Sequence, residues 1–496
     1  MLKYQNPVIL QDFSDPDVIR VNDDFYMVAS SFNFMPGLPV LHSKNLVNWE
    51  IINYVYRRFP LAKYDDVNPG HGAWAPSIRY HDGTYYVMIP TPDEGLFVSK
   101  TKDPYGKWET PYLLLAGKGY EDPCPIWVGE KCYVVHGYVK SRCGFNSKLG
   151  LMECDPDLTK VLSPSVIIYD GHNDNPTIEG PKFNYRNDYF YILAPAGSVF
   201  SGWQVCLRSK NIYGPYETKI ILATGDSHIN GPHQGALFTI DDNDNWAFIH
   251  FRDMLAYGRV TYLEKVTWYN DWPLPGRVAD PLLFGTPVSS DNYLIDKESD
   301  YNIPLSDEFK DKINLSWQTP ANPQDNWYYL NKGFNLLAGY KDRPIKYLPN
   351  FYSEKIGYYN FVVKTKVNIK KLALDEEAGL SYLGRLYSLI ALKKGKKTNQ
   401  VVIYNYDGNK EEVIKTMNYD DDDEIILKLK FISPNTYQLG YNDKWLKEKY
   451  VALKGDWVGG RIGIFSRGEG TNYANFKYFR IKEQKHDGEE SFYTRY

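Results

Sequence analysis

The sequence has little cysteine, no long apolar run and no excess of positive charge. Its five cysteines show no metal-type spacing, and their odd number is typical of reduced thiols. No apolar run approaches the roughly 18 residues of a membrane span, so no membrane partner is expected. The net charge is −4 and lysine and arginine are scattered, which argues against a nucleic-acid surface.

The N-terminal segment, MLKYQNPVILQDF, lacks the basic, apolar and small-residue succession of a signal peptide. We therefore expect a cytoplasmic protein, unless a leader has been trimmed from the chain. At 496 residues the chain is too long for one ordinary hydrophobic core, so two or three domains are expected.

An internal repeat dominates roughly the first 300 residues. A proline, a short apolar stretch, a polar turn and an aromatic-rich apolar strand recur five times, and each copy predicts a β-hairpin. The anchor prolines are Pro16, Pro76, Pro123, Pro181 and Pro232. Segments such as LHSKNLVNWE add further strands to the unit. Four strands in a unit of roughly 50 residues predict a five-bladed β-propeller over residues 1–290.

Acidic residues stand just before the anchor proline in three of the five copies, as Asp15, Asp122 and Glu179. Because the innermost strand of every blade lines the central channel, equivalent positions meet at one end of it. Carboxylates in a partly desolvated funnel raise one another's pKa. Glycoside hydrolysis needs such a set, with one carboxyl protonated and another ionised. The alternatives are ordinary Asp-Pro turns and a calcium site.

Several ordered motifs surround these residues. They include SDPDVIRV at 14–21, WAPSIRYHDGTYY at 74–86, EDPCPIW at 121–127, EGPKF at 179–183 and NGPHQGAL at 230–237. Through these motifs the N-terminal part resembles glycoside hydrolase family 43. The resemblance implies a five-bladed propeller and single-displacement inversion. It implies Asp15 as general base, Asp122 as the carboxylate that modulates the pKa of the acid, and Glu179 as general acid.

The resemblance extends to four further residues. Phe32 and Trp74 match positions that form sugar-binding walls, although blade packing is an alternative for Phe32. Arg259 matches an arginine that reaches into the substrate pocket, with a surface ion pair as the alternative. His233 matches a histidine that approaches a central calcium ion through its water shell or takes part in the pocket, so it is a candidate for both substrate binding and metal. Imidazole is a poor direct ligand for calcium. The reaction requires no cofactor, and the family implies at most a structural calcium ion in the propeller channel.

Beyond residue 276 the repeat fades, and a polar, proline-containing stretch near 288–304 predicts a linker. Strand alternation in FVVKTKVNI at 361–369, IILKLKF at 425–431 and RIGIFSRG at 461–468 predicts a β-sandwich over residues 305–485. This part resembles the C-terminal jelly-roll domain of family 43 β-xylosidases and α-L-arabinofuranosidases. The resemblance implies that it packs beside the active-site mouth and helps to close the pocket.

We therefore predict an all-β, inverting exo-glycosidase that removes terminal β-D-xylose, α-L-arabinofuranose or both from plant hemicellulose oligosaccharides. One alternative is a non-catalytic carbohydrate-binding propeller. The other is a retaining glycosidase on the same fold, with carboxyl groups ~5–5.5 Å apart instead of the ~6.5–9.5 Å of inverting enzymes. The expected partner is an oligosaccharide, and homo-oligomer formation is left open.

Overall fold

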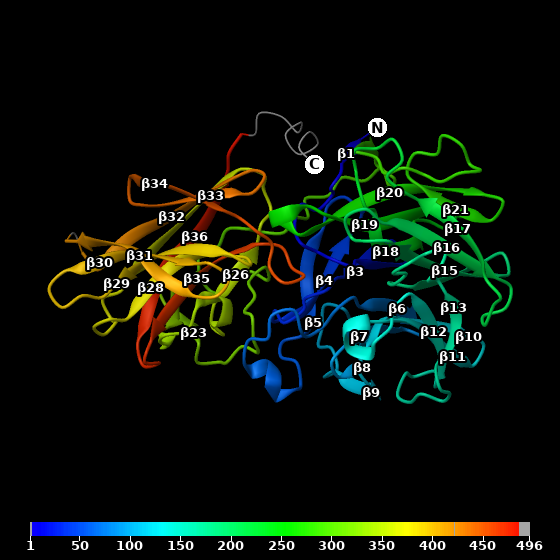
Figure 1. The fold of residues 1–496 in the computed structure, drawn as a ribbon, viewed down its shortest axis with the longest axis horizontal. Helices are drawn as coiled ribbons and strands as arrows, with labels where there is room; N and C mark the ends of the chain where they lie inside the picture. The colour runs from blue at the N-terminus through cyan, green and yellow to red at the C-terminus, as the bar shows by residue number, and fades with distance from the viewer. Residues whose placement is uncertain (1, 421, 486–496) are drawn as a thin grey trace.

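The computed structural model describes residues 2–420 and 422–485. Two β-rich domains lie side by side along the long axis, the first running from blue to green and the second from yellow to red (Figure 1). Helices in the described part are short: α1 (Lys140–Cys143) and the 3-10 segments η1 (Ala62–Asp65), η2 (Leu255–Tyr257) and η3 (Ile345–Tyr347). No helix of these residues has the length and apolar character needed to cross a membrane.

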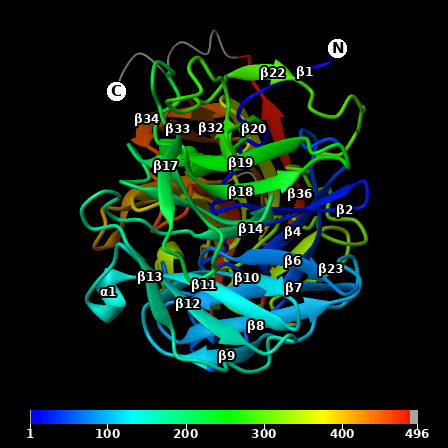
Figure 2. The ribbon, with the colours of Figure 1, turned by 90° about the vertical axis from the view of Figure 1, so that its right-hand side faces the viewer.

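The first domain consists of five four-stranded antiparallel sheets, each built from consecutive strands. Figure 2 shows the first strands of the blades near the centre, with β9, β13 and β17 towards the periphery. The strands are β2 (Asp17–Val21), β3 (Asp24–Val28), β4 (Gly37–Ser43) and β5 (Glu50–Tyr56); β6 (Ser77–His81), β7 (Thr84–Thr91), β8 (Gly95–Thr101) and β9 (Tyr112–Ala116); β10 (Tyr120–Val128), β11 (Lys131–Tyr138), β12 (Lys148–Cys154) and β13 (Val166–Asp170); β14 (Lys182–Arg186), β15 (Tyr189–Ala196), β16 (Trp203–Ser209) and β17 (Glu217–Leu222); and β18 (His233–Thr239), β19 (Trp246–Asp253), β20 (Arg259–Tyr269) and β21 (Trp272–Pro275). The predicted five-bladed propeller is confirmed.

Hydrophobic packing between blades follows from the two-residue period of a strand. In β11, Val134 belongs to the buried cluster shared with the preceding blade, and Val135 to the cluster shared with the following blade. In β19 of the last blade, Phe248 belongs to the cluster shared with the fourth blade, and Ile249 belongs to the cluster shared with the first blade. Five such clusters fill the five interfaces, so every blade is held on both faces.

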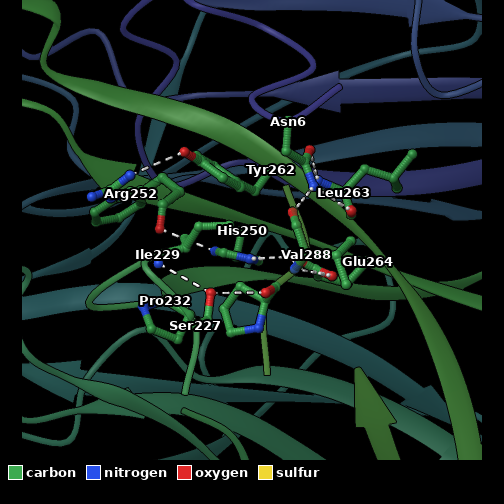
Figure 3. Close-up of polar contacts among 12 residues, drawn as sticks. Asn6, Ser227, Ile229, Pro232, His250, Arg252, Tyr262, Leu263, Glu264 and Val288 are labelled. Atoms are coloured by element: carbon green, nitrogen blue, oxygen red, sulfur yellow. Dashed lines mark hydrogen bonds and ion pairs between the residues drawn. The ribbon is translucent and has the colours of Figure 1, made fainter. Parts of the chain in front are cut away.

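The ring closes where the last blade meets the first. Strand β18 contacts β2, and β1 (Lys3–Gln5) pairs with β22 (Ser290–Asn292), which follows the propeller. Figure 3 shows the polar contacts behind this closure. The Asn6 side-chain amide donates to the carbonyls of Leu263 and Val288, and its oxygen accepts the Leu263 N–H. The N-terminal segment, the last blade and the linker are thereby joined.

The second domain is a sandwich of two seven-stranded sheets, which confirms the predicted β-sandwich. One sheet has the order β23 (Tyr328–Leu330), β24 (Phe334–Leu337), β36 (Tyr473–Glu483), β27 (Phe361–Asn368), β32 (Glu424–Ile432), β33 (Thr436–Tyr441) and β34 (Lys444–Val451). The other has the order β25 (Gly339–Tyr340), β35 (Arg461–Gly468), β28 (Glu377–Leu383), β29 (Tyr387–Lys393), β30 (Asn399–Tyr406) and β31 (Glu411–Tyr419), and β26 (Tyr352–Lys355) also pairs with β35.

The two domains share a buried interface. Propeller residues Tyr257 and Val260 belong to the same apolar cluster as the core of the sandwich. The Tyr257 hydroxyl donates to the Tyr359 carbonyl at 2.9 Å, and the Gly460 N–H donates to the Ala256 carbonyl at 2.7 Å. The loop between β34 and β35 is therefore fixed against the propeller.

Candidate active site

A cavity of about 320 Å³ lies where the inner strands of the propeller begin. Asp15, Ala75 and Glu179 line it, and each stands within three residues of the start of the inner strand of its blade. Asp122, near the start of β10, lines the same cavity. The repeat thus brings together three carboxyl groups from three separate blades.

The backbone conformation before the anchor prolines explains the residue types found there. Asp15 and Asp122 have φ values of 55° and 54°, and Gly180 and Gly231 have 59° and 55° at the equivalent positions. This left-handed region suits glycine and is tolerated by aspartate better than by most residues. In the fourth blade glycine occupies the left-handed position, and Glu179 precedes it.

Asp15 is held in place by a serine hydroxyl and a guanidinium group. The Ser30 hydroxyl donates to its Oδ2 at 2.5 Å, and Arg259 Nη1 lies 3.2 Å from its Oδ1. The Asp15 side chain is only 5% exposed. The hydroxyl and the guanidinium group thus orient the Asp15 carboxyl at the cavity.

Glu179 is the protonated member of the set. Burial and the charges of Asp122 and Asp15 raise the pKa of Glu179 to about 8, against the opposing charge of Arg259. Burial and Asp15 raise the pKa of Asp122 to about 6, although its Oδ2 accepts the Gly180 N–H at 2.8 Å. At pH 7 Asp122 is therefore mainly ionised and Glu179 mainly protonated.

Aromatic side chains form one wall of the cavity. The ring centroids of Phe32 and Trp74 lie 6.0 Å apart, and Trp457 of the second domain lies 5.9 Å from Trp74. The Arg259 guanidinium lies 5.9 Å from the ring centroid of Trp457. Both domains thus contribute to this wall, which offers flat apolar surface for a sugar ring.

His233 lies beside the cavity, at the start of β18. Its Nε2 is 3.6 Å from Glu179 Oε1, and it is 1% exposed. Within the described residues neither ring nitrogen has a hydrogen-bond partner. Burial and the nearby Arg259 lower the pKa of His233 to about 3, so the ring is neutral.

Comparison with known families decides the assignment of the chain. Residues 4–273 match the family model of glycosyl hydrolases family 43, and residues 306–482 match that of the β-xylosidase C-terminal concanavalin A-like domain. The chain belongs to glycosyl hydrolase family 43. It is a glycoside hydrolase, as the sequence predicted.

Curated relatives of this family 43 enzyme carry two activities in their names. A relative from Xylanibacter ruminicola with a provisional beta-xylosidase name is 37% identical over 79% of this chain and 73% of its own length. A non-reducing end alpha-L-arabinofuranosidase from Bacteroides ovatus is 30% identical over 76% of this chain and 73% of its own length. Among solved structures, a xylan beta-1,4-xylosidase from Bacillus halodurans superposes with a TM-score of 0.85 at 21% identity, over 97% of this chain and 100% of the other. That last likeness concerns the fold alone.

The cavity that holds Asp15, Asp122 and Glu179 also contains residues that were not singled out from the sequence. Glu121 and Gln234 line it, and their only signal was that each adjoins a residue singled out from the sequence. Trp457 also lines it, and no local pattern in the sequence connects that residue with the propeller. Of the seven candidates, Asp15, Phe32, Trp74, Asp122, Glu179 and Arg259 line the cavity, and His233 contacts it through Glu179.

Proposed function

We propose that this glycoside hydrolase is an inverting exo-enzyme that releases terminal β-D-xylose, α-L-arabinofuranose or both from hemicellulose oligosaccharides. One observation carries the proposal. A single cavity holds Asp15 paired with a guanidinium group and Glu179 with its pKa raised to about 8. A carboxyl group paired with a positive charge and a carboxyl group that holds its proton near neutral pH therefore share one cavity, as glycoside hydrolysis requires.

In the proposed reaction Asp15 takes a proton from water while the water oxygen attacks the anomeric carbon. Glu179 donates its proton to the glycosidic oxygen, which leaves as a hydroxyl group. One bond to the anomeric carbon forms as the other breaks, so the product has the opposite anomeric configuration. Asp122 keeps Glu179 protonated through its negative charge. Arg259 balances the charge of Asp15 and orients it.

The shape of the cavity supports action on a chain end. Trp457 reaches the cavity from the second domain, and Phe32 and Trp74 bound it on the propeller side. A cavity of about 320 Å³ with walls from both domains suits a terminal sugar better than the middle of a long chain. The names of the relatives support a pentose in that position.

Product stereochemistry tests the mechanism. NMR of the first product released from an aryl β-xyloside should show the α-anomer, and wild-type protein should also be assayed on an aryl α-L-arabinofuranoside. Asp15→Asn and Glu179→Gln should each lower kcat/KM by more than ~100-fold, because general acid–base catalysis contributes ~10²–10⁴. The Glu179 variant should lose least on substrates with good leaving groups.

Each negative result would contradict a different part of the proposal. A β-anomeric first product would indicate a retaining enzyme. Unchanged rates in either variant would refute the assigned roles. Sugar binding without hydrolysis by the wild type would indicate a carbohydrate-binding propeller.

A structural calcium ion near His233 belongs to the same proposal. Within the described residues no group of three or more His, Cys, Asp or Glu side chains could hold a metal, so direct ligation does not fit. The buried, unpartnered nitrogens of His233 fit an ion held through its water shell. Calcium added to chelator-treated protein should raise the Tm of the wild type but not that of His233→Ala. An equal Tm with and without calcium would exclude the ion.

A further inference from the structure

Glu121 is a fourth carboxyl group in the active-site cavity, and the proposed reaction does not use it. It lies in β10 directly before Asp122, at a register shift against β11, and is 6% exposed. Its strand partner is Gly137, and a Cβ atom added to that glycine would lie 3.1 Å from Glu121 Cγ. The glycine therefore leaves room for the Glu121 side chain at the cavity wall.

The Glu121 carboxyl has no partner within the described part of the chain. No hydrogen bond or ion pair there involves it, whereas Asp15 has Ser30 and Arg259, and Asp122 has the Gly180 N–H. Its oxygens are open to the space of the cavity, where a bound ligand can meet them.

The surroundings of Glu121 favour its neutral form. Burial, then the charges of Asp122 and Glu179, raise the pKa of Glu121 well above its usual range. A protonated carboxyl both donates and accepts hydrogen bonds, whereas an ionised one only accepts them. A sugar hydroxyl also donates and accepts, so the two groups are complementary.

We propose that Glu121 determines substrate specificity by hydrogen bonding to a hydroxyl group of the terminal sugar. This inference rests on the proposed function, because it assumes that the cavity binds the sugar that is cleaved. A site built around a hydroxyl group rejects analogues that lack it, since its buried polar group is then left unpaired. Glu121 would thus select among pentoses by the position of one hydroxyl.

Kinetics of two substitutions test the role. Glu121→Ala removes both the donor and the acceptor, and KM for the aryl glycoside should rise about 10-fold while kcat changes less than about 3-fold. Glu121→Gln keeps a donor and an acceptor in the same shape and should restore most of the wild-type KM. Glu130→Ala is the matched control, because Glu130 is exposed at the turn of the same hairpin and should leave both constants unchanged.

Monodeoxy aryl xylosides identify which sugar hydroxyl group Glu121 binds. Removing one particular hydroxyl should raise KM about 10-fold for the wild type but have little effect in Glu121→Ala, because the partner is already absent. If Glu121→Ala does not fold, Gly137→Ala provides a second route. Its added methyl group would displace the Glu121 side chain and should raise KM in the same direction.

Hydrolysis by the wild type distinguishes a failure of the Glu121 role from a failure of the proposed function. Wild-type hydrolysis with an unchanged KM in Glu121→Ala would overturn the role of Glu121 and leave the proposed function standing. A fall in kcat at constant KM would also overturn it, because Glu121 would then act on the proton-transfer groups. A wild-type protein that neither hydrolyses nor binds xylosides and arabinofuranosides would overturn both.

Discussion

The indole ring of Trp457 in the β-sandwich lies 5.9 Å from that of Trp74 in the propeller, at an interplanar angle of 50°. Residues 383 positions apart in the chain thus form one aromatic surface at the cavity that contains the three carboxyl groups. The sandwich is therefore part of the site. Its loop between β34 and β35 supplies a wall that the propeller alone does not have.

Removal of the Trp457 ring tests this wall. Trp457→Ala should raise KM about 10-fold with a smaller change in kcat, because stacking against the sugar stabilises the bound substrate and the transition state alike. Trp457 is 51% exposed, so the Tm should change little. Trp445→Ala is the control, since Trp445 is also partly exposed but lies on β34, outside the cavity. Equal KM values for Trp457→Ala and the wild type would exclude substrate contact.

The pH dependence of catalysis should reflect Glu179. Its raised pKa keeps the acid protonated at neutral pH, and it loses the proton as the pH rises through about 8. The ratio kcat/KM should therefore fall on the alkaline side near pH 8. Asp122→Asn removes a negative charge that raises this pKa, so the alkaline limb should move to lower pH. A pH–rate profile of both proteins checks the shift. An unmoved or upward-shifted limb would contradict the modulating role of Asp122.

The repeat made the propeller part of the site predictable. Asp15 and Asp122 occupy equivalent positions in two copies and Glu179 stands one residue earlier in a third, and the symmetry of the fold brings the three together in space. The left-handed backbone before four of the anchor prolines also fits the residues found there, which are Asp15, Asp122, Gly180 and Gly231.

Other parts of the site depend on tertiary contacts that no local pattern encodes. Trp457 reaches the cavity only because Gly459 and Gly460 bind the propeller backbone and Asp12. The contribution of Glu121 depends on the absence of a side chain at Gly137 in the neighbouring strand. Pairings between strands and between domains decide both, and the sequence alone did not give their register.

The free energy of unfolding should depend on pH through the buried carboxyl group of Glu264, which lies where the propeller ring closes. Glu264 accepts the Val288 N–H at 3.2 Å and faces His250 Nε2 at 3.5 Å (Figure 3). Burial raises the pKa of Glu264 well above its usual range and lowers that of His250 to about 4. The folded protein therefore keeps a proton that the unfolded chain releases above about pH 4.3. The contribution of Glu264 to the free energy of unfolding therefore falls as the pH rises, by up to about 1.4 kcal/mol per pH unit.

Glu264→Gln removes the titrating carboxyl group, so the folded and unfolded chains no longer differ in protons bound at this position. The glutamine side-chain oxygen still offers an acceptor for the Val288 N–H. Relative to the wild type, its Tm should rise between pH 5 and pH 8. Glu298→Gln, in the polar segment after the propeller, is an exposed control that should track the wild type at every pH. A Tm difference between Glu264→Gln and wild type that stays constant with pH would show that Glu264 is ionised in the folded protein.

Asp12 connects the sandwich loop that carries Trp457 to Arg259 at the cavity. Its Oδ1 accepts the Arg259 N–H and its Oδ2 accepts the Gly459 N–H, both at 2.8 Å, and it is 5% exposed. Burial lowers the pKa of nearby Lys355 to about 7, and the charge of Asp12 opposes that shift. Asp12→Asn cannot offer acceptors to both N–H groups and removes the charge, so it should cost about 2–4 kcal/mol.

The same substitution should raise KM, because Gly459 fixes the loop that carries Trp457. Asp12→Asn should therefore lower Tm and raise KM together, whereas Trp457→Ala should raise KM alone. Asp23→Asn, on a 93% exposed side chain of the first blade, should change neither quantity. A lowered Tm with an unchanged KM in Asp12→Asn would mean that Asp12 stabilises the interface without positioning the aromatic wall. Because the two substitutions act on one loop, the double variant should raise KM no further than Trp457→Ala does.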